Sequence, residues 1–157
     1  MSLSLTSPAF AAGAAIPPRH TCDGANISPP LAWSGVPAGT KSLTLIVEDP
    51  DAPDPAAPQR IWVHWVLYNL PPGSGGLPEG LRGADFPGGS GEGINDWQRS
   101  GYSGPCPPIG RHRYVHKLYA LDLMLPRFAK ATKMQLELAM RGHILEQAEL
   151  VGLYERM

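Results

Sequence analysis

Glycine and proline restrict the fold of this 157-residue sequence more than any other feature, because each contributes 18 residues. Proline lacks a backbone donor and breaks helix interiors, and glycine weakens both helices and strands, so a bundle of long helices is disfavoured. Short strands joined by many shaped loops suit such a composition better. The length fits one domain, over residues 1–157, that can bury a core of its own. We therefore predict a β-dominated fold with one or two short helices.

Three segments have the composition of strands. Residues 41–48 are apolar and β-branched, and the proline cluster that follows is expected to end this strand abruptly. Residues 60–70 are bulky on both faces, which predicts a central strand. Its alternation assigns one face to Ile61, Val63, Trp65 and Leu67, and the other to Trp62, His64, Val66 and Tyr68. In the third strand, which begins at residue 112, one face is predicted to carry His112, Tyr114, His116 and Leu118.

The remaining segments are predicted to be loops, one helix and an ambiguous tail. Residues 71–110 hold most of the glycines and little periodicity, and their aromatic residues predict a structured loop that helps to form a site. Thr132 is a good N-cap for a short helix that Gly142 would end. The pattern of residues 143–157 fits either a helix or a terminal strand.

Charge and hydropathy exclude several classes of function. With 13 Lys and Arg against 14 Asp and Glu, and no basic run, the chain lacks the positive surface that nucleic-acid binding requires. No apolar run approaches the ~20 residues of a transmembrane helix. The first 15 residues lack the basic region and apolar core of a secretory signal. Cys22 and Cys106 are expected to be free thiols, although one bridge is not excluded, and a cytoplasmic location is predicted.

Candidate site residues lie at the ends of the three strands. Asp49 and Asp51 follow the first, His64 lies within the second, and His112 and Tyr114 begin the third. A carboxylate, two imidazoles and a phenol in a small space supply the donors and acceptors that a phosphate-like anion needs. A protonated histidine would offset the anion's charge, so we expect weaker binding at high pH.

Each of these residues also has a structural interpretation. The sequence DPDAP forms a good turn, His64 could be a hydrogen-bonded core histidine, and Tyr114 could be a packed aromatic residue. A metal shared by His112 and His116 is excluded on a strand, where four residues span roughly 13 Å. No serine lies in a nucleophile elbow, and His20 and His143 are expected at the surface. No metal or cofactor is predicted.

Several motifs together resemble the phosphatidylethanolamine-binding protein family, also called Raf kinase inhibitor-like proteins, and in particular its bacterial branch. They are TCDGANISPPLAWSGVP, LIVEDPDAP, WVHWVLYNLPP, GINDWQRSGYSGPCPPIGRHRYVHKLYALD and GHILEQAELVGLYER. The resemblance implies a fold of two antiparallel sheets, with a strand at the C-terminus and a small anion pocket at one end. The residues that match the family's ligand-binding positions are Asp49, Pro53, Trp62, His64, Pro108, Gly110, His112 and Tyr114.

The same resemblance implies supporting roles and possible partners. Asp51 and Arg113 would brace the loops of the pocket, Pro107 would shape its rim, and a homodimer is expected because bacterial relatives often form one. His116 departs from the family pattern, since it occupies a position where an aromatic residue such as Phe is expected. The chain also ends without the longer C-terminal helix of eukaryotic members, which weakens any transfer of their kinase-regulating role.

Three functional hypotheses follow from the sequence. The leading one is a protein that binds phosphate, phosphoethanolamine or a similar head group and that could modulate a kinase or another partner protein. The second is a hydrolase that acts on a phosphoester, with Asp49 or His64 as general base. The third is an inhibitor of a protease or kinase that uses its loops and does not need the pocket. Of these, binding is preferred over catalysis.

Overall fold

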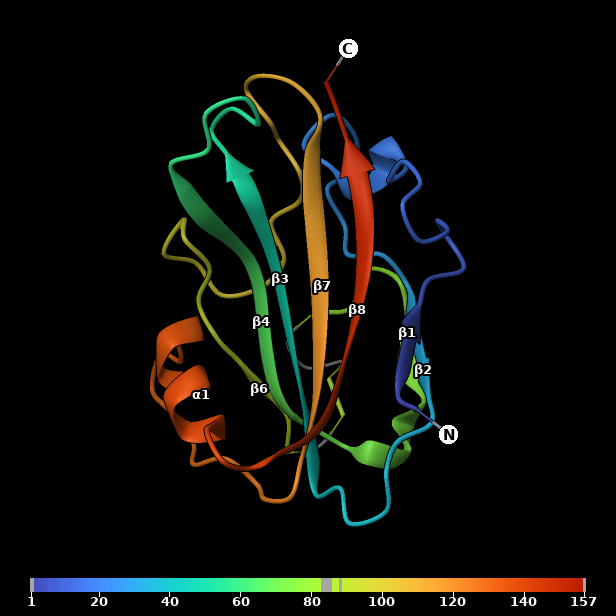
Figure 1. Ribbon diagram of the computed structural model, residues 1–157, viewed down its shortest axis with the longest axis vertical. Helices are drawn as coiled ribbons and strands as arrows, with labels where there is room; N and C mark the ends of the chain where they lie inside the picture. Colours follow the sequence, from blue (N-terminus) through green and yellow to red (C-terminus); the bar gives the residue numbers. More distant parts are fainter. Residues whose placement is uncertain (1, 83–85, 88, 157) are drawn as a thin grey trace.

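The computed structural model describes residues 2–82, 86–87 and 89–156, and it contains two antiparallel sheets (Figure 1). The larger sheet has the strand order β6-β4-β3-β7-β8, with bounds Gly91–Glu92, Arg60–Leu70, Ser42–Ala52, His112–Leu121 and Ile144–Tyr154. The smaller sheet has the order β1-β2-β5, with bounds Ser4–Thr6, Leu31–Ser34 and Gly76–Leu77. Short 3₁₀ turns cover Pro18–His20 and Pro72–Ser74. The prediction of a β-dominated fold with two antiparallel sheets is confirmed.

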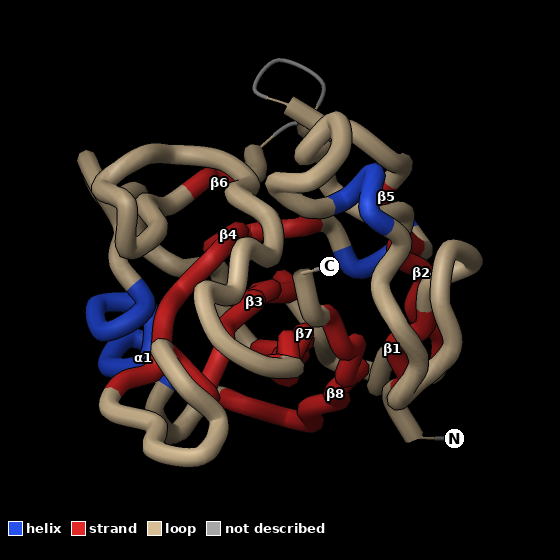
Figure 2. Tube along the Cα trace, turned by 90° about the horizontal axis from the view of Figure 1, so that it is seen from above, coloured by secondary structure: helices blue, strands red, loops and turns tan. Residues whose placement is uncertain are grey.

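The large sheet separates two apolar clusters, which explains why β3 is buried along nearly its whole length. One face packs against the small sheet through residues such as Leu45, Leu67 and Trp33. The opposite face packs against helix α1, Lys133–Met140, through Ile46, Val66, Leu136 and others. Seen from above, α1 and the small sheet lie on opposite sides of the large sheet (Figure 2). The strand predicted to be central, β4, is second in the order, because only the two-residue β6 pairs with its outer edge.

Strand β3 is longer than predicted, and the proline cluster does not end it abruptly. The strand continues through Asp49, Pro50 and Asp51 to Ala52. Its pairing with β7 stops at Glu48 opposite Val115, and its pairing with β4 becomes irregular beyond Asp49. Proline is tolerated in a strand where the ladder needs no donor. The four additional residues therefore extend past the pairing with β7, while Asp49 and Ala52 still pair with Trp62 and Arg60 of β4.

The alternation predicted for β4 is wrong in one place, because the strand contains a β-bulge. Val47 pairs with Trp65, but the next residue of β3, Glu48, pairs with Val63, so His64 is the extra residue of β4. As a result Trp65 belongs to the cluster facing the small sheet, whereas Val63 belongs to the cluster facing α1. A bulge bends the strand and turns a side chain in a new direction.

Helix α1 and the terminal strand follow the local sequence signals. The Thr132 hydroxyl accepts a hydrogen bond from the Gln135 backbone at 3.2 Å, and the Gln135 side chain accepts one from the Thr132 backbone at 3.0 Å. This capping box starts the helix as predicted. Gly142 follows its end with a φ of 83°, which glycine adopts without strain. The tail forms β8 along β7, as the family resemblance implies.

The prediction of two free thiols is wrong, because Cys22 and Cys106 form a disulfide. The two cysteines are 84 residues apart in sequence, but their loops lie side by side and bring the Cα atoms within 5.4 Å. Disulfides are rare in reducing compartments, so the two cysteines give no support to the expected cytoplasmic location. That location stays a prediction. Among the described residues, no helix is long and apolar enough to cross a membrane.

The prediction of a surface position is wrong for His20. Its side chain is fully buried, with Nδ1 3.0 Å from the Ile27 carbonyl oxygen, because the 3₁₀ turn directs it inward. His143 is exposed and pairs with Asp122 at 2.8 Å, in agreement with a surface position.

His116 is a core residue whose ring stays neutral. It is 1% exposed, lies against Phe10 with ring centroids 5.7 Å apart, and donates from Nδ1 to the carbonyl oxygens of Tyr114 and Leu150, each at 3.1 Å. Burial lowers the pKa of His116 to about 4. Since the unfolded chain binds a proton near pH 6.5 and the folded chain does not, this residue destabilises the fold as the pH falls from 6.5 toward 4.

We predict that His116→Phe makes the protein more resistant to acid. The two proteins should have similar unfolding free energies at pH 7, because Phe fills the same apolar position beside Phe10. At pH 4 the variant should be more stable by up to roughly 3 kcal/mol, since it has no buried imidazole that must lose a proton. Urea unfolding at pH 7, 5.5 and 4 measures this difference. A difference that does not change with pH would contradict the prediction.

Candidate functional site

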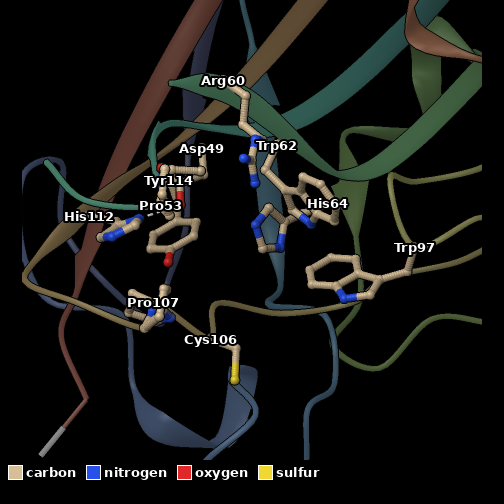
Figure 3. A pocket seen from close by; sticks show the side chains of 12 residues that line it. Asp49, Pro53, Arg60, Trp62, His64, Trp97, Cys106, Pro107, His112 and Tyr114 are labelled. Carbon is tan, nitrogen blue, oxygen red and sulfur yellow. Dashed lines mark hydrogen bonds and ion pairs between the residues drawn. The ribbon is translucent and has the colours of Figure 1, made fainter. Parts of the chain in front are cut away.

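A pocket of about 180 Å³ lies at the end of the large sheet where β3, β4 and β7 meet. Figure 3 shows side chains from these strands and from the loop before β7 turned toward a common space. The lining residues are Asp49, Ala52, Pro53, Arg60, Trp62, His64, Trp97, Cys106, Pro107, Pro108, His112 and Tyr114. The structure therefore brings together the three strand ends that carried the predicted site residues.

Asp49 and His112 form a buried pair in the wall of the pocket. His112 Nδ1 is 2.6 Å from Asp49 Oδ2, and Nε2 of the same ring is 2.8 Å from the Ile109 carbonyl oxygen. Both ring nitrogens face oxygen acceptors, so the ring is placed to donate through either of them. Burial raises the pKa of the Asp49 carboxyl, although hydrogen bonds from His112 and the Asp51 backbone act in the opposite direction. Neither nitrogen of His112 is free to bind a metal.

Asp51 and Arg113 form a second pair beside the pocket. Arg113 donates from Nε and Nη2 to the two carboxylate oxygens of Asp51 at 3.0 and 2.8 Å, and its backbone N–H donates to Oδ2 at 2.8 Å. These bonds lower the pKa of Asp51 and raise that of Arg113. The Asp51 carboxylate thus accepts from the Arg113 N–H where a backbone carbonyl would accept if the ladder between β3 and β7 continued past Glu48 and Val115.

His64 reaches the pocket because it is the extra residue of the bulge in β4. Its Nδ1 donates to the Ser103 carbonyl oxygen at 2.6 Å, and its own carbonyl accepts from the Ser103 backbone at 3.3 Å. Burial lowers the pKa of His64 to about 4, so the ring is neutral at pH 7. With its proton on Nδ1, the ring turns Nε2 toward the pocket as a hydrogen-bond acceptor.

Aromatic rings form the opposing walls. Trp97 meets the edges of His64 and Trp62 at centroid distances of 5.0 and 5.4 Å, and Tyr114 meets His64 at 5.2 Å. Burial raises the pKa of the Tyr114 hydroxyl, and the nearby Asp49 carboxylate adds to the effect, so the phenol stays protonated. Edge-to-face contacts of this kind fix the ring planes.

The rim is formed by the loops on either side of the sheet end. Pro53, Pro107 and Pro108 line it as the resemblance implies, and Cys106 lies next to them as part of the disulfide. Gly110 does not line the pocket. Its φ of 75° shapes the turn before β7, which places the Ile109 carbonyl oxygen against His112.

Sequence reasoning missed Arg60 and Trp97. The Arg60 guanidinium extends toward His64 and Trp62 in the pocket (Figure 3). Arg60, Trp62 and His64 alternate along the start of β4, so the period of a strand could have indicated Arg60. Trp97 lies in a loop without periodicity. It is positioned by Asn95, whose Oδ1 accepts from the Trp97 backbone at 2.9 Å in an Asx turn. Such a turn has a local signal, but that signal does not show that the Trp97 side chain lines a pocket.

The fold and the pocket define a small β protein of two sheets with a polar ligand pocket at one sheet end, and three comparisons agree with this class. The model of the phosphatidylethanolamine-binding protein family matches residues 6–155. The chain belongs to this family, whose members are ligand-binding proteins. It is 50% identical over 155 residues to a UPF0098 protein of Methanothermobacter thermautotrophicus, covering 98% of this chain and 99% of the relative.

Two solved structures share the fold over the whole chain. A phosphatidylethanolamine-binding protein homologue from Chlamydia trachomatis has a TM-score of 0.91 and 45% identity, with 99% of each chain covered. YbcL of E. coli, described as a new member of the mammalian family, has a TM-score of 0.89 and 32% identity, with 100% of each chain covered. The predicted family and its bacterial relatives are therefore confirmed.

We predict strong energetic coupling between Asp49 and His112. Asp49→Ala should destabilise the fold by roughly 2–4 kcal/mol, because it leaves a buried imidazole N–H and the Asp51 N–H without their acceptor. His112→Ala in the same chain should remove part of that penalty. A double-mutant cycle from urea unfolding should therefore give a coupling energy above ~1 kcal/mol.

The His143–Asp122 pair is the matched control for this cycle. It joins the same residue types at 2.8 Å, but its side chains are 45% and 44% exposed. Its coupling should stay below about 0.5 kcal/mol because solvent screens an exposed pair. Equal coupling in the two cycles would show that burial does not strengthen the Asp49–His112 pair.

Proposed function

We propose that this protein binds a small anionic group of the phosphate type in the pocket at the end of the large sheet. The observation that carries the proposal is the position of Arg60, whose guanidinium extends into a pocket lined by His64, His112 and Tyr114. A guanidinium matches the geometry of phosphate oxygens and can donate two parallel hydrogen bonds. The proposal is a binding function and includes no turnover.

The charges around the pocket favour an anion. The carboxylate of Asp49 is engaged by the His112 ring at 2.6 Å, and that of Asp51 forms an ion pair with Arg113. Arg60 has no ion-pair partner among the residues that the structure describes, so its charge is available to a ligand. Arg60 is an exposed residue, so its guanidinium lies at the solvent-facing edge of the pocket, where an anion can reach it directly.

The size and walls of the pocket limit the ligand to a small group. Drug-sized ligands occupy pockets of roughly 300–1,000 Å³, whereas this pocket measures about 180 Å³. A phosphate or phosphoethanolamine group is of the appropriate size, and acyl chains would lie outside. The faces of Trp62, Trp97 and Tyr114 offer apolar contact to the carbon atoms next to such a group. The family's name points to a head group of the same chemistry.

His64 couples anion binding to a proton. In the free protein its Nε2 is an acceptor and would repel a fully deprotonated anion. An anion oxygen can approach Nε2 only if a proton lies between them, either taken up by the ring or carried by a hydrogen phosphate. Binding therefore includes uptake of one proton when the anion brings none.

We predict that sulfate binding strengthens as the pH is lowered from 8 to 5. Sulfate is the chosen probe because it stays a dianion over this range. Since the free His64 has a pKa of about 4 and a bound anion favours its charged form, affinity should rise by up to about tenfold per pH unit where the proton is taken up. In His64→Gln the amide needs no proton, so the slope should flatten. Isothermal titration of both proteins at several pH values provides the measurement, and equal slopes would refute the coupling.

Arg60→Gln should weaken phosphate and sulfate binding by roughly 10–100-fold, because hydrogen bonds to a charged group contribute about 1.5–3 kcal/mol. Arg111→Gln removes the same charge from an arginine that is 65% exposed and lies outside the pocket lining, and affinity should change less than twofold. Titration with phosphoethanolamine, followed by NMR of the His64 and His112 rings, locates the ligand. If neither ring shifts, or if both variants bind equally, the anion does not bind here.

A further inference from the structure

Cys106, one half of the disulfide, lies in the middle of a segment whose carbonyl groups contact the rings of both pocket histidines. Ser103, three residues before Cys106, accepts from His64 Nδ1 at 2.6 Å. Ile109, three residues after Cys106, provides the carbonyl oxygen that lies 2.8 Å from His112 Nε2. Cys106 itself lines the pocket together with the two prolines that follow it. One short segment thus orients two imidazoles and forms one wall.

This segment, residues 102–109, belongs to no strand or helix of the structure, although the Ser103 N–H donates to the His64 carbonyl of β4 at 3.3 Å. It is also held against the loop of residues 20–27 by hydrogen bonds. The Tyr102 hydroxyl donates to the His20 carbonyl at 2.6 Å, the Gly104 N–H donates to Asn26 Oδ1 at 2.8 Å, and the Cys22 N–H donates to the Pro105 carbonyl at 3.1 Å.

The disulfide is the one covalent link between these two loops. The chain has two cysteines, and both are in this bond. Each of the two cysteines is partly exposed, so the bond does not lie in the core of the molecule. The strands behind the pocket, in contrast, are paired by backbone ladders that do not include either cysteine. Loss of the bond should therefore loosen the segment without dissolving the sheet.

We propose that the Cys22–Cys106 disulfide is a redox switch that controls the pocket. A dithiol reductant attacks one sulfur atom as a thiolate and forms a mixed disulfide, and its second thiol then displaces the protein sulfur. The reductant ends as a disulfide, and Cys22 and Cys106 end as thiols, with two electrons transferred. The released segment holds the Ser103 and Ile109 carbonyls less firmly, so both rings lose their fixed orientation and anion affinity falls.

The affinity readout of this proposal rests on the proposed function, so the experiment has two arms. In the first, sulfate affinity is measured at pH 6 with the disulfide intact and with dithiothreitol present. If the reduced pocket has its binding arrangement in about one molecule in five, the dissociation constant rises about fivefold. Cys22→Ser breaks the bond but keeps the Cys106 sulfur atom in the pocket wall. This variant should bind like the reduced protein and should not respond to dithiothreitol.

The second arm needs no ligand and separates failure of the switch from failure of the anion site. The ring resonances of His64 and His112 are compared between the oxidised and reduced proteins, with the buried His116 as an internal reference that contacts neither loop. The rings of His64 and His112 should shift or broaden on reduction while His116 and the strand amides stay unchanged. Unchanged rings, or measurable sulfate binding of equal affinity in the two states, would overturn the switch, whereas no sulfate binding in either state would contradict the anion site alone. Global unfolding on reduction would overturn the switch too, since the disulfide would then stabilise the whole fold and not the segment alone.

Discussion

The hydrogen bond between Asp49 and His112 is the constraint on which the rest of the site depends. It joins β3 and β7 just past Glu48 and Val115, where their backbone ladder ends. From this point carboxylate side chains replace carbonyl groups as acceptors, first Asp49 and then Asp51. Side chains are longer than backbone groups, so the strands can separate without leaving polar atoms unpaired. The pocket lies at this end of the sheet, and both Asp49 and His112 line it.

Loop segments complete what the strands begin. The wall that carries Ser103, Cys106 and Ile109 supplies two carbonyl acceptors and a half-cystine, and Asn95 fixes the loop that carries Trp97. The Ser103 carbonyl determines which nitrogen of His64 holds its proton, and hence that Nε2 is an acceptor. The strands set the positions of the imidazoles, and the loops supply part of their hydrogen bonding.

Much of the fold and part of the site could be predicted from the sequence, because both rest on local signals. Strand alternation, the Thr132 cap and the compositional bias depend on neighbours in sequence, and these predictions held apart from the bulge and the length of β3. The disulfide depends on two loops meeting across 84 residues of sequence, and the inward position of His20 depends on a short 3₁₀ turn, and neither feature has a periodic pattern. The family resemblance joined the strand ends into one pocket, but residue patterns alone left Asp49, His64 and Tyr114 open to structural interpretations.

The bulge in β4 imposes a choice on this strand. One extra residue, His64, reverses the faces of everything before it, so Trp62 points to the pocket while Val63 faces α1. If His64 were paired in regular alternation instead, the period of two would turn Trp62 and Arg60 toward the helix. Regular pairing at His64 and a pocket lined by Trp62 and Arg60 are therefore mutually exclusive for this sequence. The regular pairing of β4 is interrupted at His64, the same residue that places a titratable ring in the pocket.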